Sequence, residues 1–152
     1  MSEYLIKQLD QHLIDGWAKY NDSYEDSDQP RIVVQARIEN SHEVIEMILD
    51  TASPWNILSR EIAREYGELP PPEDTIPLST RLGKIYGQIV PFSIKLLMSH
   101  GRDIDIEGQF FIPNDDNLSI PNFIGYQGCL QRIKTVLDPQ HNGIGFSLYS
   151  GI

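Results

Sequence analysis

The sequence contains a single cysteine and no long apolar run, and these two absences restrict the class of protein. Cys129 has no second cysteine with which to form an intrachain disulfide, and no basic segment followed by an apolar one opens the chain. We therefore expect a cytoplasmic protein, because disulfides and leader segments are typical of exported ones. The apolar runs are far shorter than the roughly 20 residues of a membrane-spanning helix, so we expect no membrane partner.

Basic residues are also scarce, with 12 Lys and Arg against 22 Asp and Glu and a formal net charge of −10. Such an acidic surface repels phosphate backbones, so we expect no nucleic acid partner. The sequence has neither a phosphate-binding glycine loop nor a Gly-x-Ser-x-Gly elbow. We expect no metal and no cofactor, because the histidines are scattered without metal-ligand spacing, at His12, His42, His100 and His141.

The chain instead holds many short β-rich segments separated by prolines and glycines, which number 10 and 11 among its 152 residues. This punctuation favours strands and turns over long helices. A chain of this length forms about one domain and buries roughly two-thirds of its unfolded surface in a single core. The sequence therefore predicts a mainly β fold.

Residues 1–30 differ in pattern from the rest of the chain. Apolar residues recur at three- and four-residue spacing over residues 4–17, which predicts a helix, whereas residues 21–30 are acidic without periodicity and predict a linker or mobile loop. We expect an N-terminal helix and acidic linker over residues 1–30 and a β domain over residues 31–152. The N-terminal region is either a plain appended helix or a segment that covers a site and is trimmed during activation.

Two short segments of the β domain have helical patterns. Residues 59–66 begin at Ser59, a favoured N-cap residue. Residues 129–136 carry their apolar side chains on one helical stripe, and we expect this short helix to precede a terminal strand at residues 144–149. Because Cys129 lies on that stripe, we expect an inert buried thiol and not a nucleophile.

Residues 47–58 are the most informative stretch of the chain. An apolar run delivers Asp50 to the small-residue turn Thr51-Ala52-Ser53, and a second apolar run follows. Asp50 is therefore expected at the mouth of a packed core, where charged side chains are uncommon. The same residue types also fit an Asx-turn without any chemistry, because short polar side chains hydrogen-bond to neighbouring backbone groups.

A second feature is a pair of glycines, Gly83 and Gly87, that flank Ile85 and Tyr86 inside the β-rich residues 76–97. Glycines in such a region indicate a hairpin tip or a bulge where the backbone can approach a ligand closely. An ordinary hairpin would show the same pattern.

The Asp50-Thr51-Ala52-Ser53 turn, the glycine-bearing residues 81–87 and the later segment Phe123-Ile124-Gly125 together resemble the motifs of retropepsin-like aspartic proteases, particularly bacterial members. The resemblance covers residues 31–149. It implies a closed retropepsin-like β-barrel in which residues 123–125 thread beside the Asp50 turn. It also implies a flap hairpin at residues 81–90, with its tip between Gly83 and Gly87.

The resemblance further implies a homodimer, because one chain carries one such aspartate and the family's catalytic site lies on a two-fold axis. Two Asp50 carboxylates would share a proton and activate a water molecule against a peptide or protein substrate. The hydroxyl of Thr51 would hydrogen-bond across the axis. The substrate-binding residues that the resemblance implies are Ala52, Ser53, Gly83, Ile85, Tyr86, Gly87 and Ile124.

Two positions depart from the family pattern. Ala52 stands where the family usually has glycine, and Tyr126-Gln127 stand where retroviral members commonly have Arg followed by Asp or Asn. The sequence therefore leaves two functions open, a homodimeric aspartic endopeptidase and a catalytically silent retropepsin-like module for dimerisation or peptide binding. A third interpretation is an unrelated β-barrel in which Asp50 only caps a turn.

Overall fold

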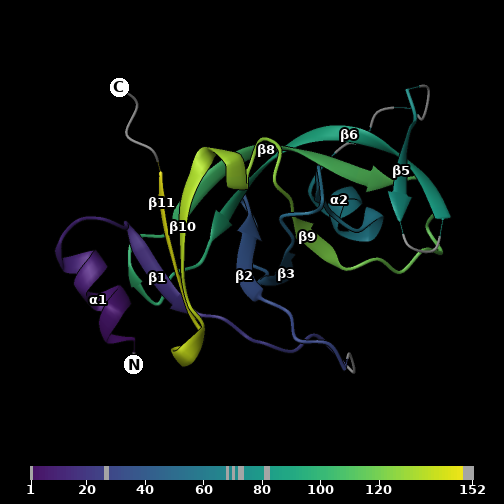
Figure 1. Cartoon of the computed structure of the whole chain (residues 1–152). Helices are drawn as coiled ribbons and strands as arrows, with labels where there is room; N and C mark the ends of the chain where they lie inside the picture. Colours follow the sequence, from purple (N-terminus) through teal and green to yellow (C-terminus); the bar gives the residue numbers. More distant parts are fainter. Residues whose placement is uncertain are drawn as a thin grey trace.

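The computed structural model describes residues 2–25, 28–67, 69, 71, 74–80 and 83–148, which are mainly β (Figure 1). The helical elements are α1 (Glu3–Asp10), α2 (Arg60–Tyr66) and the 3-10 turns η1 (Leu130–Arg132) and η2 (Pro139–His141). The strands are β1 (Gly16–Lys19), β2 (Val33–Ile38), β3 (Ile45–Leu49), β4 (Asn56–Ile57), β5 (Ile76–Thr80), β6 (Gly83–Leu96), β7 (His100–Gly101), β8 (Ile104–Pro113), β9 (Asn122–Ile124), β10 (Ile133–Asp138) and β11 (Gly143–Leu148). The predicted mainly β class is confirmed.

Parts of three predicted features lie outside the described residues. They are residues 26 and 27 of the acidic linker, Arg81 and Leu82 of the flap, and Tyr149 at the end of the terminal strand.

The larger of the two sheets formed by the described residues closes into a six-stranded barrel. Its strand order is β2-β3-β9-β4-β8-β6, and pairing of β2 with β6 completes the ring, while β5 extends the sheet along the first part of β6. β3 and β9 run parallel, as do β4 and β8, and the other neighbours are antiparallel. The predicted closed β-barrel is therefore confirmed. Closure leaves none of these six strands with a free edge.

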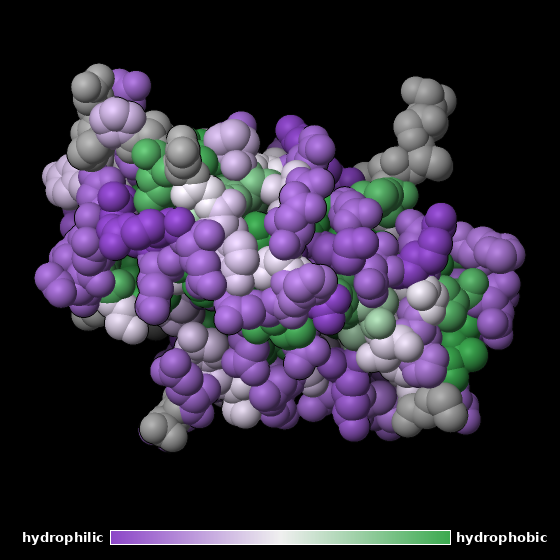
Figure 2. All heavy atoms as spheres, turned by 180° about the vertical axis from the view of Figure 1, so that it is seen from behind, coloured by the Kyte–Doolittle hydropathy of each residue, from purple (hydrophilic) through white to green (hydrophobic). Residues whose placement is uncertain are grey.

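The barrel core follows from the alternation of apolar and polar residues along its strands. In β2, Val34, Ala36 and Ile38 are buried while Gln35 and Arg37 are exposed, as expected when successive side chains point to opposite faces of a sheet. These apolar residues join those of β3, β6 and β8 in one continuous core. Figure 2 shows that the face turned away in Figure 1 is mainly hydrophilic, with separate small hydrophobic patches.

The second sheet, with strand order β10-β11-β1-β7, joins the two ends of the described chain. Figure 1 shows α1, β1, β10 and β11 together on one side of the molecule, with β5 at the opposite end. Ile144 and Phe146 of β11 belong to the barrel core, so the two sheets pack against each other. The domain boundary at residue 30 stays a prediction, although β1 pairs with β11 from Gly16↔Phe146 to Lys19↔Gly143.

The predicted helix over residues 4–17 is wrong beyond Asp10, because residues 16–19 form β1. Leu5 of α1 and Trp17 of β1 bury their side chains in the same small cluster, so a helix followed by a strand produced one apparent helical stripe. Gly16 fits the strand because its backbone approaches β7 closely: a Cβ atom there would lie 2.3 Å from the carbonyl oxygen of Arg102.

The predicted short helix at residues 129–136 is also wrong beyond Arg132. Only η1 is helical, and residues from Ile133 onward form β10, which pairs with β11 along its whole length. Its β-branched residues Ile133, Thr135 and Val136 favour a strand once a partner is available. None of the described helices combines the length and apolar character needed to cross a bilayer.

Candidate active site

Asp50 lies immediately after β3, in a turn that is hydrogen-bonded to the end of β9. Its N–H donates to the carbonyl oxygen of Ile124 at 2.9 Å, continuing the parallel pairing of Leu49 with Ile124. On the far side of the turn, the N–H of Tyr126 donates to the carbonyl oxygen of Ser53 at 2.9 Å. The turn is therefore held by backbone bonds on both sides, which fixes the position of the Asp50 Cα atom relative to the barrel.

Gly125 lies so close to the backbone of this turn that there is no room for a side chain. A Cβ atom at position 125 would lie 2.2 Å from the carbonyl oxygen of Trp55 and 2.9 Å from that of Ser53, so no other residue fits without moving the turn. The N–H of Gly125 donates to Asn56 Oδ1 at 2.9 Å, and Asn56 Nδ2 donates to the carbonyl oxygen of Gln109 at 3.4 Å.

Asn56 is a site residue that sequence reasoning missed. Its side chain is 0% exposed and links β4 to the segment after β9, 69 residues further along the chain. The sequence signal for Asn56 was an amide side chain between two apolar residues, Trp55 and Ile57. An amide that is buried at such a position needs hydrogen-bond partners from elsewhere in the fold.

The Asp50 carboxylate itself has one partner among the described residues. Its Oδ1 atom accepts a hydrogen bond from the N–H of Ala52 at 2.9 Å, and the side chains of Thr51 and Ala52 are exposed. The Ser53 hydroxyl instead donates to the carbonyl oxygen of Trp55 at 2.7 Å, so it stabilises the turn. This arrangement keeps the carboxylate accessible while the turn around it is held in place.

A β5–β6 hairpin is present where the flap was predicted, but only one of the two glycines lies at the expected end of it. β5 and β6 pair from Ile76↔Gly87 to Thr80↔Gly83, so Gly83 is the first paired residue of β6 and Gly87 is paired at the other end of β5. Gly83 has a positive φ of 116°, and Thr80 Oγ1 donates to its carbonyl oxygen at 2.7 Å. The prediction of Gly87 at the tip is wrong, because Gly87 is buried inside the paired part of the hairpin.

Packing explains the glycine at position 87, since a Cβ atom there would lie 2.3 Å from the carbonyl oxygen of Ile112. Ile85 is partly buried in an apolar cluster that also contains Trp55 and Ile57, whereas Tyr86 is 56% exposed. The hairpin therefore packs against the strand that follows the Asp50 turn. Among the described residues, no hydrogen bond or ion pair joins Asp50 to any of the predicted flap residues, which are Gly83, Ile85, Tyr86 and Gly87.

An open cavity of about 410 Å³ adjoins Asp50. Its lining comes from the segment before β2, the end of β3 with the Asp50 turn, and the turn before β11. It consists of Tyr20, Asp22, Pro30, Arg31, Ile32, Leu49, Asp50 and Asn142. Of the predicted site residues, only Asp50 lines this cavity. The residues from the N-terminal segment were not predicted as site residues, since nothing in their spacing connects them to Asp50.

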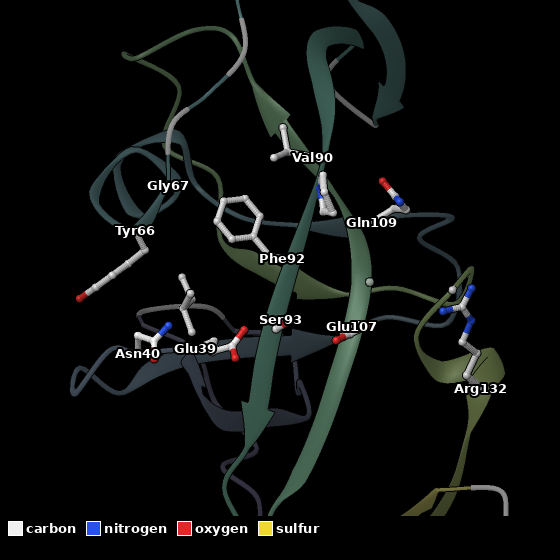
Figure 3. Close-up of a pocket in the computed structure, with 14 residues that line it drawn as sticks. Glu39, Asn40, Tyr66, Gly67, Val90, Phe92, Ser93, Glu107, Gln109 and Arg132 are labelled. Carbon is white, nitrogen blue, oxygen red and sulfur yellow. The ribbon is translucent and has the colours of Figure 1, made fainter.

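A larger hollow, of about 510 Å³, lies elsewhere on the barrel. Figure 3 shows Val90 and Phe92 of β6 facing Gly67 and Tyr66 at the end of α2, with Arg132 on the other side of the β6–β8 pair. None of its described lining residues is a predicted site residue, so size alone does not mark the site.

Cys129 is fully buried, as predicted for an inert thiol. Burial raises its pKa to about 12, against a smaller opposing effect of the Arg132 charge. Within the described ranges, no group of three His, Cys, Asp or Glu side chains is arranged to hold a metal ion.

No protein-family model matches this chain, and no curated protein is significantly similar to it. The resemblance to retropepsin-like proteases therefore rests on the three motifs alone, and the assignment of this chain to that family stays a prediction.

Proposed function

We propose that this protein is a homodimeric aspartic endopeptidase in which two copies of Asp50 activate a water molecule. The observation that carries the proposal is the Asp50 turn: a partly exposed carboxylate held at the end of a barrel strand by hydrogen bonds to the β9 end. A turn that only capped local backbone groups would need neither the Gly125 contact nor the buried Asn56 bond.

The carboxylate has acceptor capacity left for chemistry. An ionised carboxylate offers about four lone-pair sites, and the N–H of Ala52 occupies one of them. Asp50 can therefore also accept a hydrogen bond from a bound water molecule or share a proton with a second carboxylate.

One carboxylate cannot act as base and acid at the same moment, so the proposal requires a second copy of the chain. The exposed Thr51 and Ala52, together with Tyr126 at 51% exposure, form an accessible surface around the turn that suits such a partner. A two-fold axis near this surface would place the two Asp50 side chains face to face.

In this arrangement the ionised carboxylate takes a proton from water while the water oxygen attacks the peptide carbonyl carbon. The protonated carboxylate donates a hydrogen bond to the developing oxyanion. The carboxylate pair then gives the proton that it took from water to the amide nitrogen, and the C–N bond breaks. One proton remains shared between the two Asp50 side chains, as at the start.

Ala52 bears on the alternative, a silent module for dimerisation or peptide binding. Its N–H makes the bond to Asp50 Oδ1 despite the added methyl group, which supports catalysis. The methyl group nevertheless lies on the exposed surface of the turn, where a substrate would approach, which favours the silent module.

The test is incubation of the wild type and Asp50→Asn with an unbiased peptide mixture between acidic and neutral pH. We expect Asp50→Asn to lose activity by about 10²- to 10⁴-fold, the usual contribution of a general acid–base group. Asp105→Asn is the matched control, because the Asp105 side chain is 75% exposed and only pairs with Lys95 at 3.6 Å.

Cleavage that survives in Asp50→Asn would exclude the proposed chemistry. A folded, dimeric wild type that cleaves no peptide would also reject the endopeptidase. A gain of cleavage in Ala52→Gly would then locate the cause in the added methyl group.

A further inference from the structure

The cavity beside Asp50 has a wall that belongs to the N-terminal segment. Tyr20, Asp22 and Arg31 come from before β2, and Asn142 comes from the turn between β10 and β11. Residues far apart in the chain therefore meet beside the carboxylate that we propose to be catalytic.

Backbone hydrogen bonds hold this wall in place. Asn21 and Val33 exchange bonds of 3.0 and 2.8 Å, and the N–H of Arg31 donates to the carbonyl oxygen of Asp22 at 2.8 Å. These bonds close the base of the loop that begins at Asp22 and ends at Arg31. Both charged residues are therefore positioned by the fold at the rim of the cavity.

The cavity combines an apolar part with an acidic one. Ile32 and Leu49 are partly buried, and the ring of Tyr20 packs in the barrel core. The acidic part consists of Asp22 and Asp50. Burial, and then the negative charges of Asp22 and Asp138, raise the pKa of Tyr20, which agrees with an Asp22 carboxylate close to this wall.

The partners of the charged groups determine which ligand the cavity suits. Asn142 Nδ2 donates to Asp22 Oδ2 at 3.4 Å, which leaves the other carboxylate oxygen for a ligand. Arg31 Nη2 donates to Gln29 Oε1 at 3.4 Å, and Arg31 forms no ion pair among the described residues. Two carboxylates and one guanidinium give the lining a net negative charge.

We propose that this cavity is the subsite for a lysine or arginine side chain of the peptide that binds at Asp50. The methylene groups of that side chain would lie over Ile32 and Leu49, and its cationic end would reach Asp22. This inference rests on the proposed function for the presence of a peptide, but it concerns binding and does not require cleavage.

The experiment measures binding of peptides whose central bond is a non-hydrolysable hydroxyethylene isostere, using the full-length wild type and calorimetry. Lys, Leu and Glu are placed in turn at each of the three positions on either side of that bond. At one position we expect Lys to bind about 5-fold more tightly than Leu, the size of a favourable partly exposed ion pair, and Glu to bind more weakly than Leu.

Asp22→Asn should abolish the preference for Lys without changing the affinity of the Leu peptide. Glu25→Gln is the matched control, because Glu25 lies on the same loop but does not line the cavity, and it should keep the preference. Absence of a Lys preference at every position, its persistence in Asp22→Asn, or a preference for Glu that depends on Arg31 would overturn the subsite.

These outcomes separate the subsite from the endopeptidase activity. Lys-selective binding without cleavage of ordinary peptides would reject the activity and keep the subsite. Cleavage without any Lys preference would reject the subsite alone, and failure of every peptide to bind would reject it as well.

Discussion

Asp15 directly precedes β1 and Asp138 ends β10, so both lie beside the second sheet, whereas Asp50 directly follows β3 of the barrel. The three carboxylates differ in the donors that reach them. Asp15 Oδ2 accepts bonds from the N–H of Leu148 and the hydroxyl of Ser147, both at 3.1 Å. Its Oδ1 atom pairs with Arg102 at 3.3 Å. Among the residues that the structure describes, the Asp50 carboxylate accepts a bond from the N–H of Ala52, two positions along the chain, and from no other donor.

Asp138 resembles Asp15 in part, since its Oδ2 atom accepts a bond from the distant Ser2 hydroxyl and pairs with the nearby His141 at 3.0 Å. Both residues tie the N-terminal segment to the C-terminal strands. A carboxylate whose oxygens are occupied by donors from distant segments stabilises the fold, whereas one with free acceptor sites can do chemistry. Asp15 and Asp138 therefore stabilise the contact between the N-terminal segment and the C-terminal strands, whereas Asp50 has acceptor sites left for the chemistry that we propose.

The largest loss of stability and activity is expected from Gly125→Ala, which disturbs the turn that carries Asp50. The added methyl group would collide with the backbone of Trp55 and Ser53, so the Asp50 turn must move. We expect a loss of about 3 kcal/mol in the free energy of unfolding, typical of overpacking against backbone, together with loss of any peptidase activity. Urea unfolding and the peptide assay measure the two effects.

Gly128→Ala is the control for this substitution. Its φ of +74° is unfavourable for alanine, but a Cβ atom there has no atom within 4 Å. We expect a cost of about 1 kcal/mol from backbone strain alone and unchanged activity. Equal losses in the two variants would contradict the close approach under the Asp50 turn.

A smaller effect is expected from Asn56→Ala, which removes the acceptor for the Gly125 N–H. A buried donor left without a partner costs about 1–3 kcal/mol, and the small cavity left behind adds to this. We expect about 2–3 kcal/mol less stability in urea unfolding and weaker activity. Asn117→Ala, at an exposed loop position, should change stability by less than about 0.5 kcal/mol. A similarly small effect for Asn56→Ala would mean that the buried bond does not support the turn.

The smallest effect on stability is expected from Asp15→Asn, which changes a carboxylate beside the second sheet and not one beside the barrel. An amide accepts on one oxygen only, so the bonds from Leu148, Ser147 and Arg102 cannot all be kept. We expect a loss of about 1–2 kcal/mol in urea unfolding at neutral pH and unchanged peptidase activity. Asp105→Asn again serves as the control, and a loss of activity in Asp15→Asn would show that the two regions are coupled.

The stability contributed by Asp15 should also depend on pH. Burial opposes its ionisation, but the hydrogen bonds from Leu148 and Ser147 and the charge of Arg102 hold its pKa below the usual 3.8. A carboxyl with a lowered pKa in the folded state stabilises the fold above pH 3.8 and loses this contribution as the pH falls through the folded-state value. The wild type should therefore lose more stability than Asp15→Asn below pH 4. Parallel pH profiles of the two proteins would contradict this role.

Local patterns were sufficient for several elements of the fold. Ser59 caps α2 as its position before an apolar-periodic segment indicated, and its hydroxyl accepts a hydrogen bond from the N–H of Ile62 at 3.3 Å. The alternation of apolar and polar residues in β2 likewise matches the side chains that enter the core. Capping and alternation depend on residues a few positions apart, so one sequence carries the whole signal.

Patterns that depend on a distant partner were misread. The helical stripe of residues 129–136 continues into β10, because β11 offers six paired positions from Ile133 to Asp138. Residues 16–19 form β1 because β11 and β7 lie on either side of them. Tertiary pairing outweighs local periodicity in both cases, since each paired backbone group would otherwise lose its hydrogen bond on burial.

For the candidate site, the sequence by itself determined that Asp50 follows a buried strand and enters a small-residue turn. Only the tertiary structure decided what surrounds that turn: Gly125 beneath it, Asn56 bonded to Gly125, and the cavity wall formed by Tyr20, Asp22 and Arg31. The physical reason is that these contacts join residues from about 20 to 70 positions apart, which come together only when the barrel closes and the N-terminal segment packs against it.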